Sequence, residues 1–153
     1  MEEFYANWRN IVSFEKVNAD LNEMSAKAYF QHRIRQTLFF LAEDSDLCNI
    51  ALRMGVGLPE NVSMLTDRFA KKISALIAED LKIGQQFMTV RDTLNTETTA
   101  EVLTGALLRT AYHYFVKKRK KRGYSKKQIN KITNEFVDIF MPGIFVPRDK
   151  SKK

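Results

Sequence analysis

The side chains that most often carry enzyme chemistry are few and scattered in this sequence. It has two histidines, His32 and His113, and one cysteine, Cys48. None of them stands in a recognisable Ser/His/Asp, Cys/His or HExxH pattern, and the sequence has no glycine-rich phosphate loop. The tightest acidic group, at 43–46, is typical of a solvated helix end. We therefore expect a protein that is not an enzyme and that holds no metal and no cofactor.

His113 leaves one cofactor hypothesis open. A chain of 153 residues with 11 phenylalanines resembles a globin in its bulk properties. A haem ligand, however, needs an open pocket as well as an imidazole. His113 lies within Tyr112-His113-Tyr114-Phe115, an apolar segment in which a hydrogen-bonded, buried histidine is the commoner role. Haem or tetrapyrrole binding by a globin-like domain is kept as an alternative.

The positive charge of the chain is concentrated in its last quarter. The formal net charge is +7, yet residues 1–110 carry 12 Lys and Arg against 15 Asp and Glu, whereas residues 111–153 carry 13 against 3. The densest run, 117–122, lies at the C-terminus of a predicted helix, where cations interact favourably with the helix dipole. It could also contact nucleic-acid phosphates, an acidic protein or an anionic membrane, although no aromatic platform is evident beside it. A standalone helical adaptor that uses 117–122 is therefore a second alternative.

The spacing of apolar residues predicts an all-α protein. The length is typical of one domain, and apolar residues recur at three- and four-residue steps with no clean alternation. We expect a single helical domain over 1–146 with about six helices, followed by a basic disordered tail at 147–153. The predicted helices cover 2–16, 25–42, 45–54, 59–84, a fifth that is capped at Asn95 or Thr98 and is apolar over 102–116, and a sixth from Ser125 to Met141.

Residues 50–57 mimic the first part of a DNA-reading motif. Ala51 and Gly55 have the spacing of the first helix and tight turn of a helix-turn-helix. The following residues, 59–64, contain no arginine, lysine or glutamine that could read bases. We therefore do not expect a DNA-reading helix at this position.

Three segments, taken in order, resemble a known family. The first, 76–87, reads as a helix, a glycine and a short loop; the second, 95–107, reads as the start of a major helix. The third is 123–129 followed by 136–144, which reads as a closing helix with a terminal glycine. Together, residues 77–144 resemble the C-terminal part of TetR-type bacterial transcriptional regulators. The N-terminal three-helix DNA-binding head of that family has no counterpart in this sequence, so sequence-specific DNA binding would belong to a part outside it.

The resemblance implies a homodimer. In such proteins the last two helices pair with their symmetry mates as a four-helix bundle. The fifth predicted helix is apolar on nearly every side and must be covered on every side, which agrees with a partner there. The predicted contact residues are Leu103, Leu107, Ala111, Phe136 and Phe140. The alternative is that they form the core of a single chain.

The resemblance also implies a sensor of a small molecule. A small apolar or aromatic effector would shift the geometry of the dimer and so the spacing of the DNA-binding heads. The sequence has neither an apolar run of about 20 residues nor a secretory leader, so we expect a cytoplasmic protein without a membrane-spanning segment, and no membrane is among its predicted partners. The predicted effector-binding residues, for which a plain core is the alternative, are Phe30, Ile34, Phe69, Ile73, Tyr112 and His113, the last as a polar handle.

Overall fold

The computed structural model describes residues 26–43, 60–118 and 120–146, together with Ala6. This part of the chain forms four α-helices and one π-helical turn, namely α3 (Ala26–Glu43), α5 (Glu60–Gln86), α6 (Thr96–Ala111), η1 (Tyr112–Lys117) and α7 (Lys126–Ile144). The all-α class is confirmed for these residues, which contain no strand beyond an isolated bridge between Val90 and Phe145. The predictions over 45–54 and 147–153, and all of 2–16 except Ala6, lie outside the described residues.

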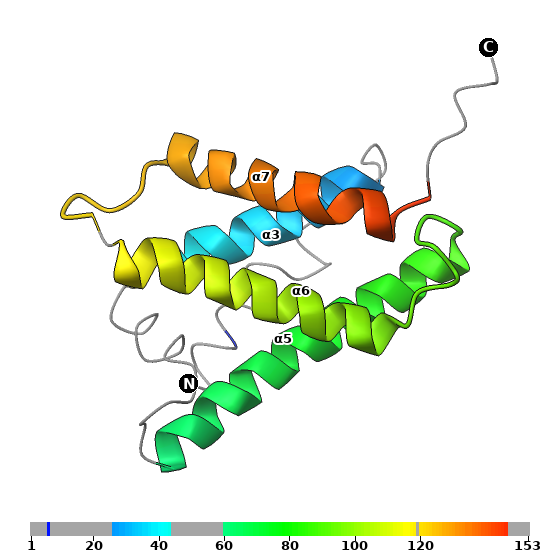
Figure 1. Cartoon of the computed structure of the whole chain (residues 1–153), viewed down its shortest axis with the longest axis horizontal. Coiled ribbons are helices and arrows are strands. Elements are labelled where there is room, and N and C mark those ends of the chain that lie inside the picture. The colour runs from blue at the N-terminus through cyan, green and yellow to red at the C-terminus, as the bar shows by residue number, and fades with distance from the viewer. Residues whose placement is uncertain (1–5, 7–25, 44–59, 119, 147–153) are drawn as a thin grey trace.

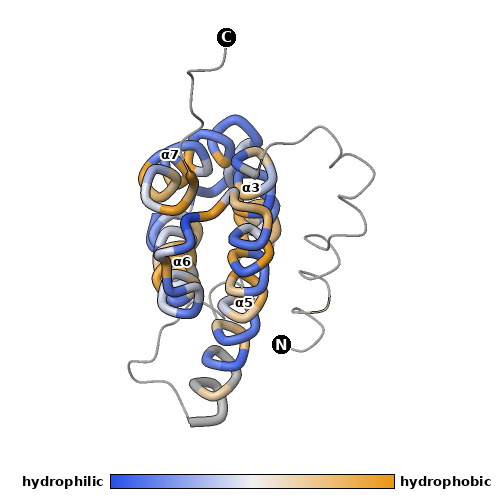
Figure 2. The backbone as a smooth tube through the Cα atoms, turned by 90° about the vertical axis from the view of Figure 1, so that its right-hand side faces the viewer, coloured by the Kyte–Doolittle hydropathy of each residue, from blue (hydrophilic) through white to orange (hydrophobic). Residues whose placement is uncertain are grey.

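The helices pack in two pairs. Helix α5 lies along α6, and α3 lies along α7 and also contacts α6. Figure 1 shows α3 between α7 and α6, with α6 and α7 running in opposite directions. Seen from the side in Figure 2, α6 and α7 lie on one side of the domain and α3 and α5 on the other. One side of the domain is therefore built from the two C-terminal helices.

The starts of α6 and α7 follow the capping signals of the sequence. The Asn95 side chain accepts a hydrogen bond of 2.8 Å from the Thr98 N–H, so Asn95 rather than Thr98 is the cap of α6. Ser125 and Gln128 form the predicted capping box at α7, because each side chain bonds the backbone N–H of the other. Helix α7 continues through Pro142 to Ile144, one turn beyond its predicted end.

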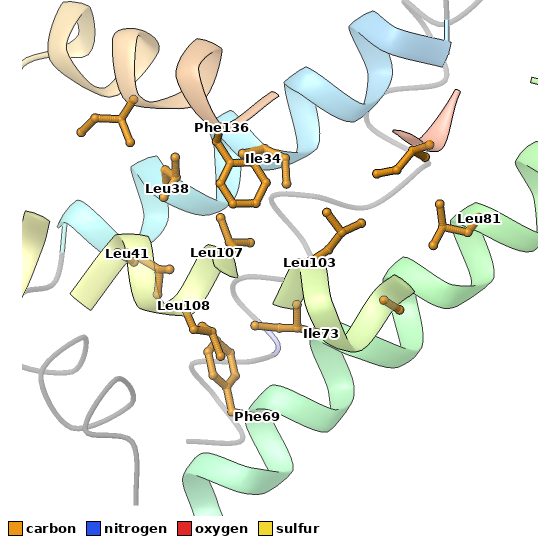
Figure 3. Close-up of a cluster of buried hydrophobic side chains, with 14 of the residues drawn as sticks. Ile34, Leu38, Leu41, Phe69, Ile73, Leu81, Leu103, Leu107, Leu108 and Phe136 are labelled. Atoms are coloured by element: carbon orange, nitrogen blue, oxygen red, sulfur yellow. The ribbon is translucent and has the colours of Figure 1, made fainter. Parts of the chain in front are cut away.

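The core lies where the four helices meet. In Figure 3, Ile34 and Leu38 of α3 face Phe136 of α7 and Leu107 of α6. On its other side α6 packs against α5, where Phe69 and Ile73 join the same buried cluster. Burial of each large apolar side chain contributes about 1.5–3 kcal/mol. The largest side chains with almost no exposed surface are Leu38, Leu41, Ile73, Leu103, Leu107, Ile129, Val137 and Thr133.

The connection that follows α5 packs closely against Gly84 and links the end of α5 to the end of α7. The Gly84 carbonyl accepts hydrogen bonds from the Thr89 and Val90 N–H groups at 2.9 and 3.1 Å, which folds the connection back onto the helix. A Cβ at Gly84 would lie 2.5 Å from a methyl carbon of buried Val90. The Arg91 N–H then donates to the Ile144 carbonyl at 3.0 Å. The start of α6 and the end of α7 are thereby held at the same end of the domain.

We expect Gly84→Ala to destabilise the protein, because the added methyl group collides with a stiff, buried valine. The free energy of unfolding should fall by about 1–3 kcal/mol relative to Gly143→Ala. Gly143 is the control because its added Cβ would meet nothing within 4 Å, so that variant should be unchanged or more stable by up to about 1 kcal/mol. Urea unfolding measures both, and equal midpoints would contradict the argument.

Candidate functional site

The six predicted effector residues do not surround one common space. Ile34, Phe69 and Ile73 are buried members of the hydrophobic core. Phe30 contacts Phe145 beyond the end of α7, with ring centroids 5.7 Å apart. Tyr112 follows the opposite end of α6, where it contacts Arg109. His113, next along the chain, meets the ring of Tyr114 edge-on at 5.0 Å. The three core residues take the alternative role that we considered for them, as packed core.

The predicted dimer residues are also covered, for the most part, by their own chain. Leu103, Leu107, Ala111 and Phe136 are 0–4% exposed in the single chain. Side chains with almost no exposed surface cannot form a contact with a second copy. These four residues are therefore core, and the dimer contact predicted for them is corrected. Phe140 is half-buried, with its ring 4.8 Å from that of Phe136. A homodimer remains a prediction, and it needs different residues of the same helices.

Such residues are present on the solvent side of α6 and α7. Val102 is 56% exposed and Ile139 is 73% exposed. The two helices are antiparallel and lie on one side of the domain (Figures 1 and 2), so the first half of α6 and the second half of α7 share one end. Gly105 and Gly143 belong to the same helices and have open space where a side chain would be. We call Val102, Gly105, Ile139 and Gly143 the outer face.

One buried hydroxyl in α6 has no hydrogen-bond partner. Thr104 is 2% exposed, and its Oγ1 bonds to no other group in the described part of the chain. The buried Thr133 of α7 differs, because its hydroxyl donates to the Ile129 carbonyl at 2.9 Å. An orphaned buried hydroxyl costs about 1–3 kcal/mol. Thr104 is therefore a position at which a bound molecule with a polar atom would gain a partner.

A second surface feature is the end of the domain where α6 leads into α7. The sequence between Glu101 and Glu135 contains ten lysines and arginines and no acidic residue. All nine of the described cations among them are exposed. We call residues 112–118 and 120–127 the basic end. Its cations have no acidic neighbour along the chain to balance them.

Aromatic rings gather at the basic end. The Tyr124 ring meets those of Tyr114 and Phe115 edge-on, with centroids 6.1 and 5.3 Å apart. Its hydroxyl donates to the Lys118 carbonyl at 3.0 Å, and the Lys120 ammonium lies over the ring, 4.7 Å from its centroid. The aromatic platform that was not evident from the sequence is therefore present beside the basic run, which corrects that expectation.

The backbone is also irregular at this point. The Lys118 N–H donates to the His113 carbonyl at 2.9 Å, which closes a turn of π-helix rather than α-helix. Such turns are rare and occur often at functional sites. Gly123 then adopts a φ of 66°, a left-handed conformation that glycine takes at no steric cost, and so turns the chain back towards α7.

Comparison with known proteins assigns no family. No family model matches the chain, and neither a curated protein nor a solved structure is significantly similar to it. None of the described helices combines the length and apolar character needed to cross a bilayer. The described residues also contain no group of three or more His, Cys, Asp or Glu side chains placed to hold a metal ion. The function is therefore argued from the chain's own residues.

A polar cluster ties α3 to α5. Arg33 donates through Nε to the Tyr29 hydroxyl at 2.6 Å and through Nη2 to Asp80 Oδ1 at 3.0 Å. Burial raises the pKa of Asp80 from 3.8 to about 6, against the opposing effect of the Arg33 charge. Burial likewise raises the pKa of the Tyr29 hydroxyl. The cluster joins two helices that share few other contacts.

The two buried threonines give a first test of the site. Replacing Thr104 by Val removes an unpartnered hydroxyl and keeps the shape, so the free energy of unfolding should rise by about 1 kcal/mol or more. Thr133→Val is the matched control, because it deletes a formed hydrogen bond and should cost about 0.5–1.5 kcal/mol. Denaturant titrations compare the two. A loss of stability in the Thr104 variant would show that its hydroxyl is satisfied.

Asp80 gives a second test, through pH. Its pKa is raised on folding, so the protonated form adds stability that is complete below about pH 4 and is lost as the pH rises through about 6. Between about pH 4 and 7, the unfolding free energy of the wild type should fall relative to that of Asp80→Asn by on the order of 2 kcal/mol. A wild-type-minus-variant difference that stays constant over this range would refute the raised pKa.

Proposed function

We propose that this chain is the dimerisation and effector-sensing domain of a TetR-type regulator, and that two copies associate through the outer face. The observation that carries the proposal is the exposure of Val102 and Ile139 on two antiparallel helices that lie on the same side of the domain. Covering an exposed apolar side chain with a partner stabilises the complex by about 25 cal/mol per Å² of apolar surface removed from water. The resemblance of residues 77–144 to that family supports the same pair of helices.

The chemistry of the outer face suits an isologous contact. A two-fold axis places α6 and α7 of one copy against those of the other, so that each residue meets its complement twice. Gly105, with open space above it, allows the helix of the partner to approach closely. Exposed charges of both signs flank the apolar residues on the same helices, with Arg109 on α6 and Glu135 and Asp138 on α7. These charges would form the polar rim that surrounds the apolar centre of a typical interface.

Thr104 supports the sensing part of the proposal. It lies on the same helix as Val102 and Gly105, but on the buried side, so a molecule bound at its hydroxyl would press on the helix that forms the contact. A ligand would have to displace packed side chains of the core to reach it, because Thr104 is only 2% exposed. The molecule expected there is small and largely apolar, with one polar atom to pair with the hydroxyl. Its binding would change the preferred arrangement of the two copies.

The proposal predicts that charge at position 139 separates the copies without unfolding them. We expect Ile139→Glu to weaken association by about a hundredfold or more, because both copies of the residue lie in the contact. Light scattering at high salt, which screens the basic end, should then give 17.8 kDa in place of twice that mass. Circular dichroism should be unchanged.

Two controls frame this result. Phe136→Glu, three residues away, puts a charge into the core and should instead lower the free energy of unfolding by several kcal/mol. Met64→Glu charges an exposed apolar residue of α5 and should leave the dimer intact. A wild-type chain that is monomeric at high concentration, or an Ile139 variant that stays dimeric, would refute the proposed contact.

A further inference from the structure

The basic end has an unusual distribution of charge. Exposed cations come from three consecutive pieces of backbone, namely the end of η1 (Lys117), the connection (Lys120, Lys121 and Arg122) and the start of α7 (Lys126 and Lys127). No acidic residue occurs between Glu101 and Glu135 in the sequence, and none of the ion pairs among the described residues involves these cations. Like charges this close repel one another and lower stability, so a surface of this kind is favourable mainly when an anion covers it.

The tyrosine at the centre of this surface is held in place from several sides. Two edge-on ring contacts and the hydrogen bond to the Lys118 carbonyl fix the Tyr124 side chain. Lys120, whose ammonium lies over the ring, is itself an exposed residue. The ring face that it covers therefore opens towards solvent. A flat group can replace the ammonium there, which frees Lys120 to bind an anion beside it.

The kind of anion follows from what surrounds these cations. A membrane surface would favour apolar side chains beside the charges, since these insert among the lipids. The large apolar side chains that are most exposed in the described part of the chain are Met64, Phe87, Met88, Val102, Ile139 and Val146, and none belongs to the basic end. Cations around a fixed, half-exposed aromatic ring instead match a polymer that alternates phosphates with flat bases.

We propose that the basic end is a binding site for single-stranded nucleic acid. Phosphates bind the cations of the connection and of the first turn of α7, and an unpaired base stacks on Tyr124. Base pairs of a duplex are stacked on one another and offer no free base face to the ring, so the single strand is preferred. The proposal does not depend on dimerisation, because the site lies within one chain.

The first experiment tests whether the cations of the connection between η1 and α7 bind the oligonucleotide. The full chain is titrated against fluorescein-labelled oligo(dT) of about 12 nucleotides and followed by fluorescence anisotropy. The variant Lys120→Gln, Lys121→Gln, Arg122→Gln should bind at least tenfold more weakly, and the slope of log K against log salt should become shallower by about 2, or about 0.7 for each lost phosphate contact. All three residues are exposed, so the variant should fold as the wild type does.

A matched triple on α5 separates a site from a general attraction. Arg68→Gln, Lys71→Gln, Lys82→Gln removes the same number of exposed charges from another surface. It should change affinity by less than about twofold, since these cations lie outside the site. Equal losses in the two triples would overturn the proposal. Weak binding of the oligonucleotide together with binding to vesicles rich in phosphatidylserine would also overturn it, in favour of a lipid surface.

The aromatic part has its own test. Tyr124→Leu should weaken oligo(dT) binding about fivefold or more, whereas Tyr124→Phe keeps the ring and should stay close to the wild type. Circular dichroism and the unfolding midpoint verify that both variants fold. A hairpin duplex of the same length should bind more weakly than the single strand at equal salt. Equal or tighter binding of the duplex would overturn the preference for a single strand, and so would a Leu variant that folds and binds like the wild type.

Discussion

Helix α6 has to be covered on two sides at once, and the arrangement of the other helices depends on this demand. Leu103, Leu107 and Ala111 leave almost no surface exposed. Helix α5 covers one side of α6, while α3 and the Phe136 side of α7 cover the other. What remains of α6 is a narrow solvent side around Val102 and Gly105. The core and the proposed contact surface are thus two sides of a single helix.

Local signals in the sequence predicted the helices of the described residues well. Helix α3 was expected over 25–42 and spans Ala26–Glu43, and the capping box at Ser125 begins α7 as expected. These features depend on neighbouring residues alone, because a cap and an apolar repeat are formed within one or two turns. The turn that folds back onto Gly84 was harder to foresee, since it requires Val90 to pack against a helix that ends before it.

The division between core and surface could not be predicted from the same signals. Phe136 and Ile139 belong to one apolar stripe, yet the first is 4% exposed and the second 73%. Helix α3 packs against only part of that stripe. Which part it covers is decided by the tertiary packing of the helices and cannot be read from α7 alone. Thr104 and Thr133 each follow a large aliphatic residue inside a helix, so their sequence positions look similar. Only the Thr133 hydroxyl, however, donates to a carbonyl of its own helix. The rings at the basic end meet because the chain turns at Gly123, which spacing along the chain does not reveal.

The π turn at Tyr112–Lys117 has a consequence for how this protein can vary in length. A π turn uses roughly one residue more than an α turn, and each helical residue rotates the chain by about 100°. Losing one residue here would restore a continuous α-helix and leave the core residues before it undisturbed. Because the π turn takes up the extra residue within a single turn, the lysines after it would keep the side that they now occupy. Related chains that differ by a single residue at this place would therefore keep both the same interior and the same direction of their positive charge.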